Sequence, residues 1–273
     1  MPLYQAIVLA IVQGLTEFLP ISSTAHLALF PWLLGWKDPG LTFDVALHAG
    51  TLVAVAVYFW RYWLEMAGLV LGQKWGGNPG HGLDRKLLWF LAAATVPAGV
   101  AGWLLEHHAE ESFRTPVVIG LALIVVGLLM GAGERLGRQR VVLERVSFAD
   151  AISVGIAQAL AIIPGVSRSG ITMTAGMFRG MKRDTAARFS FLLSTPIIAG
   201  AALKASLNIL RQGIAPDMVA PFVLGIVVAA VVGYMVIAVL IRYLERGTFR
   251  IFVVYRIALG VLVLALGWGL RHV

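Results

Sequence analysis

Apolar runs long enough to cross a lipid bilayer recur along the whole length of this 273-residue chain. A helix needs about 20 residues to cross roughly 30 Å of hydrocarbon. A cleaved signal peptide would supply one such run near the start, so it does not explain the pattern. Full crossings are predicted at residues 42–60, 87–105, 115–133, 185–209, 218–241 and 251–270. We therefore predict an all-α integral membrane protein with six transmembrane helices in one membrane domain, residues 1–273.

Composition agrees with a lipid environment and excludes several kinds of site. Hydrophobic residues make up 59% of the chain and charged residues 13%, with a mean hydropathy of +0.85, which a soluble domain of this size could not carry. The absence of cysteine excludes disulfides, thiolate metal sites and a cysteine nucleophile. The net charge is +8, but Lys and Arg lie mostly in short connections, so no nucleic-acid partner is expected.

Two further apolar stretches, about 3–35 and 149–180, are broken in the middle by proline, glycine and hydroxyl residues. The breaks read Pro-Ile-Ser-Ser-Thr at 20–24 and Pro-Gly-Val-Ser-Arg-Ser-Gly at 164–170. Irregular backbone at membrane depth is tolerated only where protein buries it or where it lines a cavity. We predict that each stretch is a re-entrant pair of helices joined by a turn.

The two halves of the chain resemble each other when the sequence is shifted by 145 residues. The shift aligns Ala6, Ile7, Ile11, Gln13, Leu15 and Ser22 with Ala151, Ile152, Ile156, Gln158, Leu160 and Ser167. The two breaks then coincide, and residues 1–140 and 141–273 each contain one re-entrant pair and three crossings. An odd number of crossings inverts the second half, so we predict an inverted-topology internal repeat.

Loop charge predicts the orientation in the membrane. Basic residues gather in three connections, near 61–86, 135–145 and 242–250. Such connections face the cytoplasm. If the re-entrant pairs do not cross, all six spans agree with this assignment and both chain ends face outward.

The first break carries a carboxylate in an apolar run. Gln13 and Glu17 lie four residues apart and share one helical face. A carboxylate within an apolar span is costly, so we expect Glu17 to pair with a cation, a proton or a metal. The alternative is that Glu17 lies near a helix end and reaches interfacial water.

Three hydroxyls and an imidazole follow Pro20, at Ser22, Ser23, Thr24 and His26. We expect a helix to start here, and helix N-termini bind phosphate oxygens through unpaired backbone N–H groups. Ser22 is equally explained as a helix cap. His26 is a candidate for acid-base work, although a buried histidine satisfied by its neighbours is the plainer alternative.

The second break supplies a positive charge, Arg168, between two apolar stretches. Its planar guanidinium can bind two phosphate oxygens at once, and the flanking glycines allow close approach of the backbone to a phosphate. The alternative is a purely structural ion pair with Glu17. The further phosphate-binding candidates around Arg168 are Gly165, Ser167, Ser169, Gly170 and Thr172.

A second polar pair, Asp44 and His48, again lies four residues apart on one helical face. It could support the site, but a structural pair near a helix entry explains it more simply. Small residues at Gly225, Ala229, Ala230 and Gly233 could line a helix interface within one protomer or between two, which leaves a homodimer open.

Both breaks resemble signatures of the undecaprenyl-diphosphate phosphatase family, also called the bacitracin-resistance proteins. The first signature is matched by residues 13–26, from Gln13 to His26, and the second by residues 164–170, around Arg168. The resemblance covers essentially the whole chain. It implies a hydrolase of the bacterial inner membrane that removes the terminal phosphate of undecaprenyl diphosphate and so recycles the lipid carrier for cell-wall synthesis.

The resemblance also implies a divalent cation, Mg²⁺ or Ca²⁺. The leading position of the first signature is Glu or Gln in the family and is Gln13 here, so one carboxylate fewer is available. We expect Glu17, helped by Gln13, to hold the cation on the diphosphate, while Arg168 and the amides of 167–170 bind the outer phosphate. Ser23 is the expected nucleophile with His26 as its base; alternatively, His26 activates water.

The isoprenoid tail of such a substrate would stay in the bilayer while its diphosphate enters a polar cavity between the two halves. We expect that cavity to open toward the cell exterior. Because broken helices within an inverted repeat are also typical of secondary transporters, a carrier or flippase of polyprenyl phosphate lipids is the alternative function.

Overall fold

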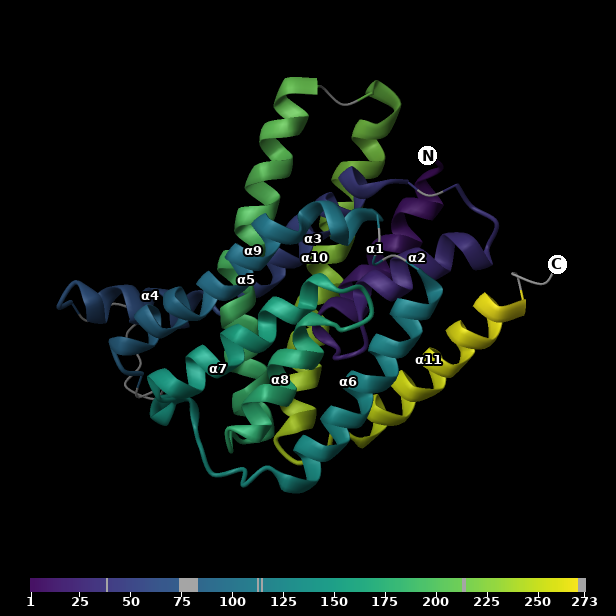
Figure 1. Ribbon diagram of the computed structural model, residues 1–273. Helices are drawn as coiled ribbons and strands as arrows, with labels where there is room; N and C mark the ends of the chain where they lie inside the picture. The colour runs from purple at the N-terminus through teal and green to yellow at the C-terminus, as the bar shows by residue number, and fades with distance from the viewer. Residues whose placement is uncertain (38, 74–82, 112, 114, 213–214, 270–273) are drawn as a thin grey trace.

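The computed structural model describes residues 1–37, 39–73, 83–111, 113, 115–212 and 215–269. Within these ranges the chain forms eleven α-helices and two short 3-10 helices (Figure 1). The elements are α1 Leu3–Phe18, α2 Ser23–Leu33, α3 Leu41–Tyr58, α4 Trp60–Val70, α5 Lys86–Glu111, α6 Pro116–Leu136, η1 Leu143–Arg145, α7 Phe148–Ala159, η2 Leu160–Ile162, α8 Arg168–Phe178, α9 Arg183–Gln212, α10 Pro216–Leu244 and α11 Arg250–Gly269. The prediction of an all-helical chain is confirmed for this part of the protein.

Five of these helices are long and apolar enough to cross a membrane: α5, α6, α9, α10 and α11. The predicted span at 42–60 corresponds to α3, which bends by 65° into α4, and the pair counts as a sixth candidate. Aromatic Phe59 lies at the bend, where its amide still bonds to the Val55 carbonyl. The predicted spans therefore coincide with observed helices, while the number that cross the bilayer stays a prediction.

Both predicted breaks are present. The first apolar stretch forms α1 and α2 with a break at residues 19–22, and the second forms α7, η2 and α8 with a break at 163–167. Ser22 and Ser167 end the breaks with positive φ angles of 76° and 67°. Each caps the following helix, because its hydroxyl accepts a hydrogen bond from the amide three residues later.

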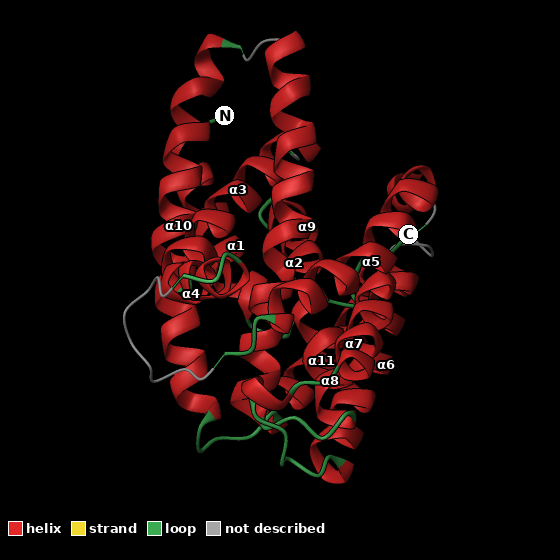
Figure 2. Cartoon of the chain, turned by 90° about the vertical axis from the view of Figure 1, so that its left-hand side faces the viewer, coloured by secondary structure: helices red, strands yellow, loops and turns green. Residues whose placement is uncertain are grey.

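Three sets of helices pack most extensively. α10 packs against α1 and α3, while α5 packs against α7 and also contacts α9; α6 and α11 lie side by side (Figure 1). Loops at residues 137–147 and 245–249 gather at the end of the molecule opposite the tips of α9 and α10 (Figure 2). The breaks therefore lie in the interior, surrounded by long helices.

The small residues of α10 form contacts within the protomer. A Cβ added at Gly225 would lie 2.9 Å from a Leu47 side-chain carbon, and one added at Gly233 would lie 2.8 Å from the ring of Phe18. Gly50 of α3 lies equally close to α10. These residues let α1 and α3 approach α10 closely within the protomer, while a homodimer stays a prediction.

Candidate active site

Glu17, near the end of α1, is the centre of the polar cluster. Its side chain is buried, as is that of Gln13 one helical turn earlier. The Gln13 amide Nε2 donates a hydrogen bond of 3.1 Å to Glu17 Oε2. The predicted sharing of one helical face by these two residues is therefore observed.

The first break turns the chain so that α2 starts beside Glu17. The Ser23 hydroxyl, on the first residue of α2, donates a hydrogen bond of 2.6 Å to Glu17 Oε2. A short contact of this kind is expected when a hydroxyl donates to an ionised carboxylate. The break thus places a hydroxyl and a carboxylate together, six residues apart in the chain.

The second break brings Arg168 to the same carboxylate. Arg168 is the first residue of α8, and its Nη2 forms an ion pair with Glu17 Oε1. Its Nη1 donates to the backbone carbonyl of Ser194 on α9 at 3.2 Å. The pair connects residues 151 positions apart, so the structure brings the two predicted charges together. A purely structural ion pair would make the same contact, and the role of both residues in phosphate binding stays a prediction.

The remaining hydroxyls of the breaks are engaged in local hydrogen bonds. Ser169 donates to the Leu19 carbonyl at 3.2 Å and so links the two breaks directly. Thr172 lies 2.6 Å from the Ser190 hydroxyl and 2.7 Å from the Arg168 carbonyl. Thr24 is exposed, and its hydroxyl lies 3.1 Å from that of Ser22. Of these three predicted phosphate-binding residues, Thr172 has the most hydrogen bonds from its hydroxyl to other protein groups.

Gly165 and Gly170 are both needed for close packing. Gly165 has a positive φ of 93°, and a Cβ there would lie 2.5 Å from the Ile119 carbonyl oxygen. A Cβ at Gly170 would lie 2.9 Å from Nη1 of Arg256. Gly170 donates its amide to Ser167. These glycines therefore accommodate protein neighbours as well as any phosphate.

His26 contacts neither Ser23 nor Glu17 through a hydrogen bond among those of the described chain. Its Nδ1 lies 2.7 Å from the Ser22 carbonyl and its Nε2 lies 2.7 Å from the Tyr255 hydroxyl on α11. Since only a protonated Nδ1 can bond to a carbonyl, a neutral ring accepts the tyrosine hydrogen at Nε2. The role of His26 as the base for Ser23 stays a prediction and requires another ring orientation.

His48, which the sequence suggested as a structural partner of Asp44, lies closer to the centre of the cluster. Its Nε2 is 3.5 Å from Glu17 Oε2, and its Nδ1 is 2.7 Å from the Asp44 carbonyl. A protonated ring would therefore form an ion pair with Glu17. The spacing of Asp44 and His48 pointed to the right helical face, but it could not show that α3 packs beside α1.

Two residues of α11, Tyr255 and Arg256, were not predicted. They lie in the final apolar span, where the single arginine among many aliphatic residues was the only available signal. Arg256 is completely buried and donates to carbonyls in both breaks. Tyr255 stacks against His26 with an interplanar angle of 10°.

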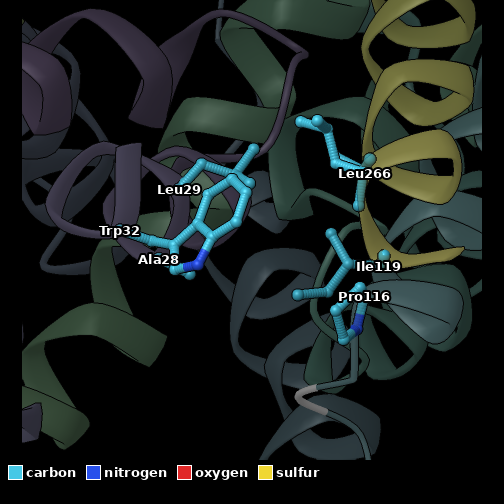
Figure 3. A pocket seen from close by; sticks show the side chains of 8 residues that line it. Ala28, Leu29, Trp32, Pro116, Ile119 and Leu266 are labelled. Carbon is cyan, nitrogen blue, oxygen red and sulfur yellow. The ribbon is translucent and has the colours of Figure 1, made fainter. Parts of the chain in front are cut away.

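An apolar pocket lies between α2 on one side and α6 and α11 on the other (Figure 3). Its α2 wall is formed by Ala28, Leu29 and Trp32, which share one helical face. Ser23, at the start of α2, lies on the opposite face of the helix. The pocket is therefore separated from the Glu17 cluster by the body of α2.

The fold and this cluster define a class of protein: a helical protein with several apolar spans and a buried, charged centre built from two broken helices. Such a centre suits an enzyme or carrier that handles an anionic lipid. The chain belongs to the bacitracin resistance protein BacA family, whose model matches residues 6–262. It is therefore a multi-pass membrane protein of that family.

Curated relatives cover nearly the whole chain and carry one name, undecaprenyl-diphosphatase. The relative from Moorella thermoacetica is 52% identical over 268 residues, which is 98% of this chain and 99% of the relative. The relative from Desulforudis audaxviator is 50% identical and covers 96% and 97%, respectively. A third, from Pelotomaculum thermopropionicum, is 48% identical and covers 97% of both chains.

Proposed function

We propose that this protein hydrolyses undecaprenyl diphosphate to undecaprenyl phosphate and inorganic phosphate, and so recycles the lipid carrier used in cell-wall synthesis. The observation that carries this function is the convergence of Glu17, Ser23 and Arg168, from two breaks far apart in the chain, on one buried point. The names and high identities of the full-length relatives support the same reaction.

In our proposal, Arg168 and the first amides of α8 bind the terminal phosphate. A guanidinium can place two N–H groups on one phosphate, and the positive end of α8 favours the same charge. Binding requires Arg168 to exchange Glu17 for phosphate oxygens, which leaves the carboxylate free to act. In this proposal, the ion pair of Glu17 and Arg168 is the substrate-free state of the site, and phosphate replaces Glu17 as the partner of Arg168.

We propose Ser23 as the nucleophile, with Glu17 rather than His26 as the group that receives its proton. The hydrogen bond of 2.6 Å between them supports this route. A bond forms from Ser23 Oγ to the terminal phosphorus, and the bond from that phosphorus to the bridging oxygen breaks. Undecaprenyl phosphate leaves, and water then hydrolyses the phosphoserine to release inorganic phosphate. Direct attack by water activated by His26 is the alternative.

We further propose that a divalent cation, Mg²⁺ or Ca²⁺, assists the reaction. Gln13 Oε1 is buried and has no hydrogen-bond partner in the described chain. This oxygen is therefore available to bind a cation. Gln13 and Glu17 fit weak binding in which most ligands come from the diphosphate and water. Groups of three acidic or histidine ligands are absent from the described residues. The cation would neutralise charge on the diphosphate.

The arrangement that we propose in the membrane is an inverted repeat with residues 1–140 and 141–273 as its halves, and with both broken pairs re-entrant. The equivalent packing of α1 on α10 and of α7 on α5 supports it, as do the matching caps Ser22 and Ser167. Gln13 and Gln158, aligned by the repeat, both retain unpaired buried amide atoms. With basic loops at the cytoplasmic face, the site opens toward the cell exterior.

Phosphate release from farnesyl diphosphate by purified protein tests this function. The short prenyl chain keeps the substrate soluble while it retains the diphosphate. We expect stoichiometric release of phosphate and farnesyl phosphate that stops when a chelator is added. A protein that binds the lipid but releases no phosphate at any metal concentration would instead be a carrier or flippase, the alternative function.

A further inference from the structure

Arg256 is the largest fully buried side chain of the described chain, and the proposed reaction does not use it. It lies on α11 with no exposed surface. Its Nη1 donates to the Pro20 carbonyl at 3.0 Å, and its Nη2 donates to the carbonyls of Gly165 and Val166 at 2.8 and 3.0 Å. Nε reaches the Leu123 carbonyl on α6 at 3.3 Å.

The acceptors of Nη1 at Pro20 and of Nη2 at Gly165 and Val166 belong to the irregular segments that form the site. Pro20 lies in the first break, three residues after Glu17 and three before Ser23. Gly165 and Val166 lie in the second break, directly before the Ser167 cap of α8. Carbonyls in such breaks have lost their helical partners and need donors when they are buried. One guanidinium, with five N–H groups in a fixed plane, supplies both breaks at once.

The charge of Arg256 is not needed for these hydrogen bonds. All of its recorded partners are backbone carbonyls, and none of the carboxylates in the described ranges forms an ion pair with it. Burying an ion without a counter-charge costs several kcal/mol. Nη1 would lie 2.9 Å from a Cβ at Gly170, so the charge lies at the N-terminal turn of α8, where phosphate is proposed to bind.

We propose that Arg256 is a positioning residue for the hydrolysis: it fixes the two breaks relative to each other so that Glu17 and Ser23 meet Arg168, and its charge favours the incoming diphosphate. The proposal rests on the proposed function. It separates two properties, the fork-shaped geometry and the positive charge. Lysine retains the charge, but its single ammonium cannot reach carbonyls in both breaks. Glutamine retains neither the charge nor the fork.

The test compares Arg256→Lys and Arg256→Gln with the wild-type enzyme on farnesyl diphosphate. Displacement of reacting groups by about 1 Å costs roughly 100-fold in rate, so we expect kcat of Arg256→Lys to fall by about that factor. Its inhibition constant for orthovanadate, a phosphate analogue, should stay close to that of the wild type. Arg256→Gln should lose kcat by at least as much and should also bind orthovanadate about 10-fold more weakly.

The control is Arg183→Gln. Arg183 forms an ion pair with the buried carboxylate of Glu134. Among the described residues, none of its hydrogen bonds involves either break, so the variant reports general destabilisation. Thermal midpoints are measured for all variants, and isolated membranes replace purified protein if Arg256→Gln unfolds in detergent. We expect Arg183→Gln to lose stability but to keep kcat and the orthovanadate constant in its folded fraction.

Two results would overturn the proposal. One is wild-type kcat in the folded fraction of Arg256→Lys, which would mean that the fork does not position the site. The other is an unchanged orthovanadate constant in Arg256→Gln, which would mean that the charge does not act on the ligand. Absence of phosphate release by the wild-type enzyme in the same assay would instead contradict the proposed function itself.

Discussion

The Ser23 hydroxyl donates a hydrogen bond of 2.6 Å to the Glu17 carboxylate, across the break between α1 and α2. Nucleophilic hydroxyls in enzymes are activated by an adjacent base in this way. The contact therefore gives Ser23 a chemical role that its position at a helix start alone would not give. In the proposed mechanism it favours Glu17 as the base, because both ring nitrogens of His26 lie at hydrogen-bond distance from Ser22 and Tyr255.

Replacing the nucleophile should abolish turnover without unfolding the protein. We expect Ser23→Ala to lower kcat by about 10³-fold or more. Removal of one residue from a group that acts together in catalysis costs nearly as much rate as removal of the whole group. Phosphate release and acid-stable phosphoserine in quenched reactions are the measurements. Ser153→Ala is the control, because Ser153 is half-buried and its hydroxyl donates, among the described residues, to the Ala149 carbonyl of its own helix. Normal turnover in Ser23→Ala together with loss in His26→Ala would establish the water route.

The ion pair of Glu17 and Arg168 predicts different effects for its two partners. Arg168→Lys keeps a charge for Glu17 but loses bidentate phosphate binding, so we expect kcat/KM to fall by about 10²–10³-fold with little loss of stability. Glu17→Gln leaves a buried guanidinium without its counter-charge and should cost about 3–5 kcal/mol of folding free energy in addition to activity. Kinetics and thermal unfolding in detergent measure both. Near-normal rates in either variant would remove the proposed site.

Much of this site was predictable because membrane burial makes polar residues informative. A carboxylate at position 17 and a guanidinium at 168 are costly in apolar runs, so each predicted a partner, and the two breaks identified where irregular backbone would lie. The sequence also offered Ser22 as a helix cap, whereas the equivalent cap at Ser167 was not predicted. Apolar run lengths likewise predicted the long helices, although not the 65° bend between α3 and α4.

The contributions of α3 and α11 could not be predicted in the same way. His48 and Arg256 reach the breaks only because their helices pack beside α1 and α6. Periodicity shows which face of a helix a residue occupies, but it does not show which neighbour that face meets. The predicted contact between His26 and Ser23 is not observed in the described part of the chain for the same reason. The two residues are close in sequence, but the His26 ring forms a hydrogen bond with Tyr255 of α11, which is distant in sequence.

The two histidines near the breaks should therefore differ in their effect on chemistry. His48 Nε2 lies 3.5 Å from Glu17 Oε2, while His26 lies beside Tyr255. We expect His48→Gln to lower kcat by about 10–100-fold, which reaches only the lower limit of what positioned acid-base groups contribute. His26→Gln should act mainly through KM or stability. Steady-state kinetics on both variants decide between them, and a larger kcat loss in His26→Gln would return His26 to the catalytic role.

The close approach of α3 to α10 predicts a stability effect that is independent of catalysis. A Cβ at Gly50 would lie 2.4 Å from the Ile226 carbonyl oxygen and 2.9 Å from Cβ of Ala229. Overpacking of this kind costs about 1–3 kcal/mol, so Gly50→Ala should lower the thermal midpoint. Gly99→Ala is the matched control, since no atom lies within 4 Å of its added Cβ. Equal midpoints for the two variants would contradict the packing of α3 on α10.

Gln13 offers a test of the proposed cation. Its Oε1 is buried and unpaired in the described chain, next to the Glu17 carboxylate. A second carboxylate at this position would add charge to an oxygen-ligand site, and affinity for hard cations rises with the number of charged ligands. We expect Gln13→Glu to lower the Mg²⁺ concentration that gives half-maximal phosphate release. Gln13→Leu, which removes the oxygen but keeps the volume, should raise it. Cation titrations of chelator-treated enzyme measure both shifts. If neither variant moves the midpoint, the cation is held by the diphosphate without Gln13, and Glu17 serves the serine alone.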